Sequence, residues 1–128
     1  MMARWSRCVY PTGLVEDADD LRALVRDMLI GLGHSVIEAA SADEAMALLA
    51  DLPDIALILS DIQLMGEATG LDLAKRLPPD APPLVLMTSL PIDDAQFLAA
   101  QTLAPVLRKP FDVKDLTALI APSELAAQ

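Results

Sequence analysis

Short apolar runs alternate with helical patterns along almost the whole chain. Runs of strand length lie at residues 13–15, 34–38, 55–60, 83–88 and 105–108, and helical spacing of apolar residues follows at 19–32, 41–49, 70–77, about 94–103 and 112–120. Strands that alternate with helices are joined by right-handed crossovers and lie parallel to one another. The sequence therefore predicts a doubly wound α/β sheet, with its ligand crevice beyond the carboxyl ends of the strands.

The first strand carries the weakest signal. Pro11 cannot donate a ladder hydrogen bond and Gly13 weakens a strand interior, although this position in the fold calls for a central strand. We expect strand structure only at 13–15. The predicted organisation is an N-terminal extension or irregular start at residues 1–12, one domain at 13–121 and a short C-terminal tail at 122–128.

Length and charge limit the classes of function. With 128 residues the chain is the size of one domain. Its 19 acidic and 9 basic residues give a formal net charge of −10, which argues against direct binding to nucleic acid, because that affinity comes largely from Lys and Arg. The acidic balance favours metal ions and partners with basic surfaces.

The apolar segments and the one cysteine indicate the compartment. Hydrophobic residues make up 54% of the chain, but each run is interrupted before it could span a bilayer. The first ten residues lack the apolar core of a secretory signal. Cys8, the one cysteine, has no internal partner for a disulfide. We therefore expect no membrane segment and a cytoplasmic location.

Chemically active side chains stand where the predicted strands end. Glu16 and Asp17 follow the first strand, Asp61 follows the third, Thr88 ends the fourth, and Lys109 follows the fifth. Because the carboxyl ends of parallel strands share one edge of a sheet, we expect these residues to gather there. Clustered carboxylates repel one another unless a cation lies between them. The pattern predicts a site for a hard metal ion with a lysine beside it.

This set of residues, together with Pro110 and Phe111 after Lys109, resembles the receiver domain of bacterial two-component response regulators. The resemblance covers roughly residues 14–120 and depends on several spaced matches. It implies a flavodoxin-like, five-stranded parallel sheet of order 2-1-3-4-5 with five helices. It also implies a cis peptide bond before Pro110 that directs the lysine inward.

The resemblance assigns roles to individual residues. Asp61 would be the phosphoacceptor, Lys109 would pair with the phosphoryl group or with Asp61, and Thr88 would hydrogen-bond a phosphoryl oxygen. The cofactor would be Mg²⁺, whose ligands would be Asp17, Asp61, the backbone carbonyl of Gln63 and a water held by Glu16.

The function implied is a phosphorelay. The chain would take a phosphoryl group from a sensor histidine kinase or a histidine phosphotransfer protein and would signal through a downstream protein target. It would not be an enzyme toward other substrates, because it would catalyse only its own phosphorylation and dephosphorylation. Whether it relays phosphate between histidines or acts as a stand-alone regulator stays open.

Two positions depart from the family pattern. Val106 stands three residues before Lys109, where receivers usually carry an aromatic residue that rotates on phosphorylation. The segment after Asp61 has Met65-Gly66 where Pro-Gly is common, and residues 67–70 include one more residue than usual. We expect Thr88 to close on the phosphoryl group and loop and helix shifts to provide the readout.

Three alternatives compete with this interpretation. A flavodoxin-like module that binds a nucleotide or a flavin would place Gly, Ser or Thr, rather than Glu16 and Asp17, after the first strand. A phosphatase with an Asp nucleophile would need an acid where Gln63 stands. A degenerate receiver that acts only as a protein-binding scaffold shares the fold and stays open.

His34, the one histidine, is expected at the surface or at a sheet edge.

Overall fold

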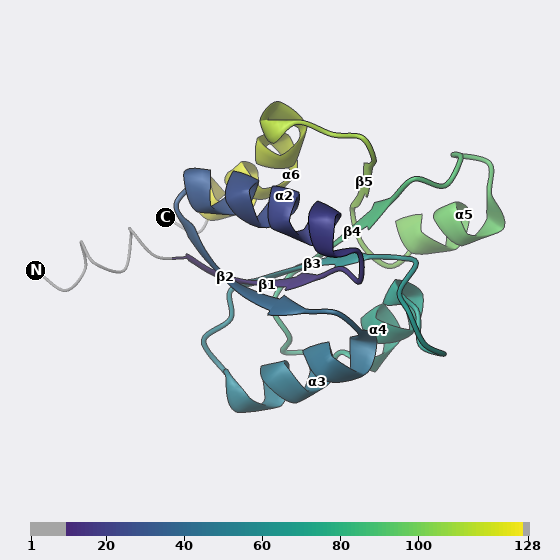
Figure 1. Cartoon of the computed structure of the whole chain (residues 1–128), viewed down its shortest axis with the longest axis horizontal. Coiled ribbons are helices and arrows are strands. Elements are labelled where there is room, and N and C mark those ends of the chain that lie inside the picture. The colour runs from purple at the N-terminus through teal and green to yellow at the C-terminus, as the bar shows by residue number, and fades with distance from the viewer. Residues whose placement is uncertain (1–9, 127–128) are drawn as a thin grey trace, which may run out of the picture.

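Five parallel strands form one sheet in the computed structural model, which describes residues 10–126. The strands are β1 (Tyr10–Val15), β2 (His34–Ala39), β3 (Leu57–Asp61), β4 (Leu84–Thr88) and β5 (Val106–Arg108). Their order across the sheet is β2-β1-β3-β4-β5 (Figure 1). The predicted flavodoxin-like order is confirmed.

Five helices of the described chain cover both faces of this sheet. Helices α2 (Asp19–Gly31) and α6 (Val113–Ala126) lie on one face, and α3 (Ala42–Asp51), α4 (Gly70–Arg76) and α5 (Ala95–Gln101) lie on the other (Figure 1). Within residues 10–126, none of the helices combines the length and the apolar character needed to cross a bilayer.

The core divides into two layers because successive strand residues point to opposite faces of a sheet. All five residues of β3 are buried. Leu57 and Leu59 pack in the cluster under α2 and α6, whereas Ile58 packs in the cluster under α3 and α4. This burial on both faces explains why the third strand reads as an unbroken apolar run.

β1 begins at Tyr10, earlier than the predicted strand at 13–15. Pro11 is compatible with a central strand here because it stands at the beginning of the pairing with β3. The carbonyl of Pro11 accepts a hydrogen bond from Ala56 N at 2.7 Å, and the paired register of β1 with β3 starts only at Thr12 and Leu57. The missing N–H therefore falls outside that ladder. Most of the predicted N-terminal extension, residues 1–9, lies outside the described residues.

The helix ends follow the sequence signals at most positions. The Ser41 side chain accepts a hydrogen bond from Glu44 N at the start of α3, and the Glu44 carboxylate accepts one from Ala40 N. α6 continues to Ala126, past the predicted helix end at 120 and into the segment expected to be a tail.

His34 takes one of its two expected placements, the edge of the sheet. It lies in the edge strand β2, as predicted, but not at the surface, because only 5% of its area is exposed. Its Nδ1 lies 2.7 Å from Thr12 Oγ1, and its ring meets the Tyr10 ring edge-on with centroids 4.8 Å apart. These contacts to β1 bury the imidazole at the edge of the sheet.

Candidate functional site

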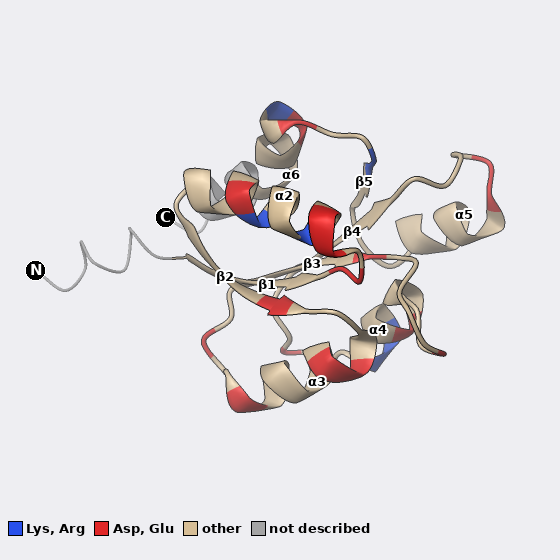
Figure 2. Cartoon of the chain, in the orientation of Figure 1, with Lys and Arg blue, Asp and Glu red and all other residues tan. Residues whose placement is uncertain are grey.

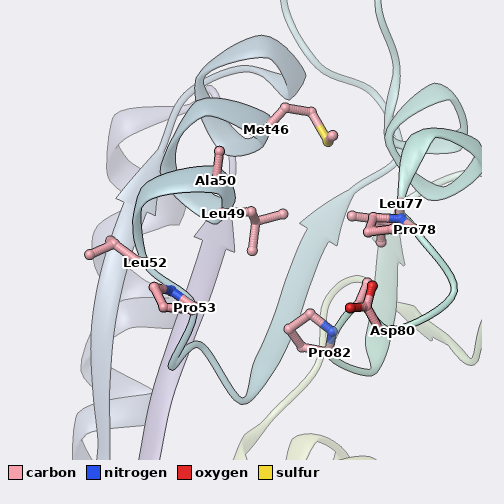
Figure 3. A pocket seen from close by; sticks show the side chains of 10 residues that line it. Met46, Leu49, Ala50, Leu52, Pro53, Leu77, Pro78, Asp80 and Pro82 are labelled. Carbon is pink, nitrogen blue, oxygen red and sulfur yellow. The ribbon is translucent and has the colours of Figure 1, made fainter.

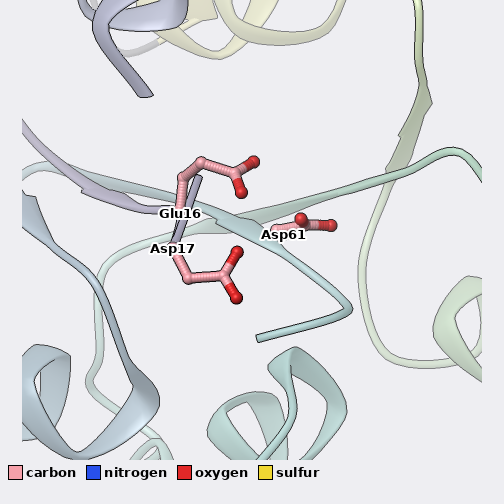
Figure 4. A group of neighbouring side chains, drawn as sticks. All are labelled: Glu16, Asp17 and Asp61. Carbon is pink, nitrogen blue, oxygen red and sulfur yellow. The ribbon is translucent and has the colours of Figure 1, made fainter. Parts of the chain in front are cut away.

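Three carboxylates meet at the carboxyl edge of the sheet. Glu16 and Asp17 directly follow β1, and Asp61 is the last residue of β3. The register that pairs Val15 with Ser60 brings these two strand ends together. Carboxylate oxygens of the three residues lie within 4.8 Å of one another, on side chains that face a common space (Figure 4).

Lys109 supplies the cation that this cluster needs. Its Nζ donates to Glu16 Oε1 at 3.0 Å and to Asp61 Oδ2 at 2.9 Å. The lysine follows β5, its backbone N donates to the carbonyl of Thr88, and the Lys109–Pro110 peptide bond is cis, as the resemblance implied. The ammonium therefore lies between two of the three carboxylates.

Burial makes the charge balance at this edge important. The side chains of Glu16 and Asp61 are only 1% and 8% exposed. Burial raises the pKa of Glu16 because desolvation penalises its charged form, while the hydrogen bond from Lys109 acts in the opposite direction and the charge of Asp61 adds to the rise. A cation beside Glu16 therefore favours the ionised form of this buried carboxyl.

Thr88 and Gln63 complete the set predicted from the sequence. Thr88 is the last residue of β4 and is fully buried, and its Oγ1 accepts a hydrogen bond from Leu90 N at 3.0 Å. The exposed Gln63 lies two residues beyond Asp61, and its backbone N donates to Asp61 Oδ1 at 3.3 Å. The role of its carbonyl as a metal ligand stays a prediction.

The donor set fits a hard divalent cation. All three clustered side chains offer carboxylate oxygens, which Mg²⁺ prefers over the nitrogen and sulfur ligands of transition metals. In formal charge, three carboxylates against the one ammonium of Lys109 leave two negative charges. A divalent ion would balance them.

Gly70 is a residue of this site that sequence reasoning missed. It opens α4, is buried, and donates its N–H to the carbonyl of Ile62 at 2.7 Å. A Cβ at this position would collide with the carbonyl oxygen of Asp61 and would lie 2.8 Å from Ile62 Cα. The glycine therefore lets helix α4 start directly against the backbone of Asp61. A glycine at a predicted helix start was the available signal.

Arg22 was also missed. It lies one turn into α2, and its guanidinium contacts the carbonyl of Glu16 and the carboxylates of Asp19 and Glu38. The signal was an arginine close behind the acidic pair, but its partner Glu38 comes from another strand, and that pairing depends on the folded register.

The structure shows where the two departures noted in the sequence lie. Val106 opens β5, pairs with Leu86 and is half-buried. In the segment after Asp61, Gly66 has a φ of 96°, a conformation that favours glycine, and Met65 is 72% exposed.

A separate hollow of about 350 Å³ lies between the end of α3 and the segment that leads from α4 to β4 (Figure 3). Its walls are mainly apolar and include Met46, Leu49, Leu77 and Pro82, with the carboxylate of Asp80 among them. None of the residues predicted for the site line this hollow.

Charge is distributed unevenly over the described chain. Acidic residues occur in the loops, in β2 and β3, and on every helix except α5. Within residues 10–126, basic residues are confined to α2, α4, α6, the last residue of β5 and the residue after it (Figure 2). Glu16 and Asp17 form an acidic loop after β1, and among the described residues Arg22 and Lys109 are the basic residues that contact it.

Comparisons with known proteins agree with this geometry. A family model described as the response regulator receiver domain matches residues 13–121. A receiver domain protein of Clostridium thermocellum superposes with a TM-score of 0.80 at 19% identity, over 92% of this chain and 96% of that one. The chemotaxis protein CheY4 of Vibrio cholerae superposes with a TM-score of 0.77 at 22% identity, over 89% of this chain and 98% of that one.

The signal receiver domain of a modulated diguanylate cyclase from Desulfovibrio desulfuricans gives a TM-score of 0.75 at 27% identity, over 92% of this chain and 98% of that one. No curated protein matches the sequence. The structural matches at lower identity show the shared fold, and the family model covers most of the chain.

Proposed function

The chain belongs to the response regulator receiver domain family, and we propose that it is the phosphoacceptor of a two-component phosphorelay. It takes a phosphoryl group onto Asp61 from a sensor histidine kinase or a histidine phosphotransfer protein. The observation that carries this proposal is the convergence of a buried Asp61 with Glu16, Asp17 and Lys109 at one edge of the sheet.

In the proposed reaction, a carboxylate oxygen of Asp61 attacks the phosphorus. The new O–P bond forms as the P–N bond to the donor histidine breaks, and the product is an acyl phosphate. Positioning and charge dominate such a transfer. The buried site supports both, because strand ends fix the carboxylates and Lys109 contacts Asp61 directly.

Mg²⁺ would be held by Asp17, Asp61 and the carbonyl of Gln63, with Glu16 holding a bound water, and when bound it would offset the charge of the phosphoryl oxygens. Lys109 pairs with Asp61 Oδ2 before transfer and would pair with a phosphoryl oxygen afterwards. The Thr88 hydroxyl, which now accepts from Leu90 N, would donate to another phosphoryl oxygen.

The output would be a protein contact. Receiver domains are in general signalling domains rather than enzymes, and we propose that this chain catalyses only its own phosphorylation and dephosphorylation. Because Val106 cannot make the aromatic rotation, movements of the loop after Thr88 and of the neighbouring helices would transmit the phosphorylated state. The acidic balance favours a protein target over nucleic acid, in the cytoplasm.

Phosphorylation with a small donor tests the proposal. The purified protein is incubated with acetyl phosphate and Mg²⁺, and its intact mass is measured. We expect the mass of one phosphoryl group to be added, and we expect neither Asp61→Asn nor wild type in EDTA to gain it. A wild-type protein that gains no mass although Mg²⁺ binds would instead indicate a receiver that serves only as a scaffold.

A further inference from the structure

Arg22 makes contacts that place it in the site without touching the reacting atoms. Its Nη1 donates to the carbonyl oxygen of Glu16 at 2.9 Å, its Nη2 to Asp19 Oδ1 at 2.8 Å and its Nε to Glu38 Oε1 at 3.0 Å. These acceptors belong to three different segments: the end of β1, the first residue of α2 and strand β2. One guanidinium therefore joins all three.

The contact to Glu16 is the informative one. The carbonyl of Glu16 belongs to the peptide unit that connects Glu16 to Asp17, the two carboxylates that follow β1. Fixing the orientation of that peptide fixes the directions in which both side chains leave the backbone. Among the described residues, the other hydrogen bonds of this turn do not involve the Glu16 carbonyl: Glu16 N donates to Ala39 O, Ala18 N to Glu16 Oε2, Arg22 N to Ala18 O, and Lys109 Nζ to Glu16 Oε1.

The surroundings of Arg22 suit a rigid clamp. Its side chain is only 20% exposed, and its hydrogen bonds to Asp19 and Glu38 raise the pKa of the guanidinium further above its ordinary range. A guanidinium offers donors in a fixed, planar fork, whereas a lysine ammonium is a single point charge. The three acceptors are bonded by three different nitrogens of the Arg22 guanidinium, which one ammonium nitrogen could not replace.

We propose that Arg22 is a positioning residue that pre-organises the acidic loop for Mg²⁺. The inference rests on the proposed function, because it assigns Glu16 and Asp17 to a metal site. Groups that orient metal ligands commonly change metal affinity by about 10-fold or more when they are lost. Arg22 would act in this way through the backbone between the two acidic residues.

The sign of the effect separates positioning from simple electrostatics. Replacing Arg22 with Gln removes a positive charge close to a cation site, so charge alone would strengthen Mg²⁺ binding. If Arg22 holds the loop in its binding geometry, the same substitution weakens Mg²⁺ binding instead. The two explanations predict opposite changes in one measured quantity.

Arg26 provides the matched control. It lies one turn further along α2, its Nη1 is 3.6 Å from Glu38 Oε2, and its other ion pair is with Asp27. Arg26→Gln removes the same charge from the same helix and the same glutamate, but its ion pairs do not include the acidic loop. We expect this variant to bind Mg²⁺ as tightly as the wild type, or slightly more tightly.

Calorimetric titration with Mg²⁺ tests the proposal on the full chain. We expect about 10-fold weaker binding for Arg22→Gln, and a clear loss also for Arg22→Lys, which keeps the charge but not the fork. In acetyl phosphate reactions the Mg²⁺ concentration for half-maximal phosphorylation rises, while the extent at saturating Mg²⁺ stays near that of the wild type.

If Arg22→Gln and Arg22→Lys both bind Mg²⁺ at least as tightly as the wild type, the positioning role is overturned and the proposed function stays intact. A reduced extent of phosphorylation at saturating Mg²⁺ also contradicts it, because Arg22 would then affect more than the metal. If the wild type itself binds no Mg²⁺, the proposed function fails and this inference fails with it. If Arg22→Gln does not fold, the Mg²⁺ affinity of Arg22→Lys decides between the positioning role and simple electrostatics.

Discussion

At the scale of single residues, Lys109 compensates the charge of carboxylates that the fold buries. It contacts Glu16 and Asp61, which are 1% and 8% exposed in their side chains. Removing one partner of a buried ion pair leaves an uncompensated charge and costs more than the pair contributes. The lysine is thus a stabilising residue of the apo-protein as well as a candidate contact of the phosphoryl group.

Lys109→Met is expected to lower the free energy of unfolding by about 3 kcal/mol at neutral pH. Added Mg²⁺ should restore part of the loss, because it would replace the missing cation. Urea unfolding with and without Mg²⁺ measures both effects. The control is Lys114→Met, an exposed lysine of α6, which should change stability by less than about 0.5 kcal/mol.

The stability loss of Lys109→Met should depend on pH, and the pKa of Glu16 sets the sign of that dependence. Burial raises the pKa of this carboxyl and Lys109 opposes the rise, so the pKa of Glu16 rises further in Lys109→Met. A carboxyl with a raised pKa contributes stability below its unfolded pKa and loses that contribution as pH rises through its folded pKa. The stability deficit of the variant should therefore grow from about pH 4 toward neutrality; a deficit that shrinks over this range contradicts the account.

At the scale of secondary-structure elements, α4 packs against the end of β3 at a single glycine. Gly70→Ala would drive a Cβ into the backbone of Asp61 and Ile62. We expect a loss of about 1–3 kcal/mol in the free energy of unfolding, the usual cost of overpacking, together with weaker Mg²⁺ binding, because Asp61 must shift. Gly31→Ala is the control, since Gly31 lies in the last turn of α2 with open space around its Cα.

Gly31→Ala should leave the free energy of unfolding unchanged or raise it by up to about 1 kcal/mol. Chemical unfolding of both variants gives the comparison. Equal changes in the free energy of unfolding for Gly70→Ala and Gly31→Ala would show that the close approach of α4 to β3 does not require a glycine.

The elements themselves were largely predictable from the sequence, and their exceptions have local causes. The apolar run of β3 and the helical spacing of α2 gave the right structure because burial decides both patterns. The start of β1 was missed because Pro11 is unfavourable inside a ladder, but here its missing N–H falls before the pairing with β3. His34 was expected at the surface or at an edge and lies at an edge; its burial there was not foreseen, because Thr12 and Tyr10 of the neighbouring strand contact it.

At the scale of the whole molecule, the topology assembles the candidate site from distant parts of the chain. Glu16 and Lys109 are 93 residues apart in sequence and 3.0 Å apart in space. Strand-end positions could be predicted, since parallel strands share an edge, and so the placement of Glu16, Asp17, Asp61, Thr88 and Lys109 at strand ends was expected from the sequence. Gly70 and Arg22 had only weak signals in the sequence, because their contacts depend on how separate elements pack in the folded chain.

The central claim is that a divalent cation among these carboxylates equips Asp61 to accept a phosphoryl group. A crystal structure of the protein grown with Mg²⁺ and beryllofluoride, a phosphoryl mimic, tests it most directly. The account predicts a cation bound by Asp17 and Asp61, with beryllofluoride attached to Asp61 and contacted by Lys109. An empty pocket at saturating concentrations of both, with Lys109 still joining Glu16 to Asp61, would contradict it.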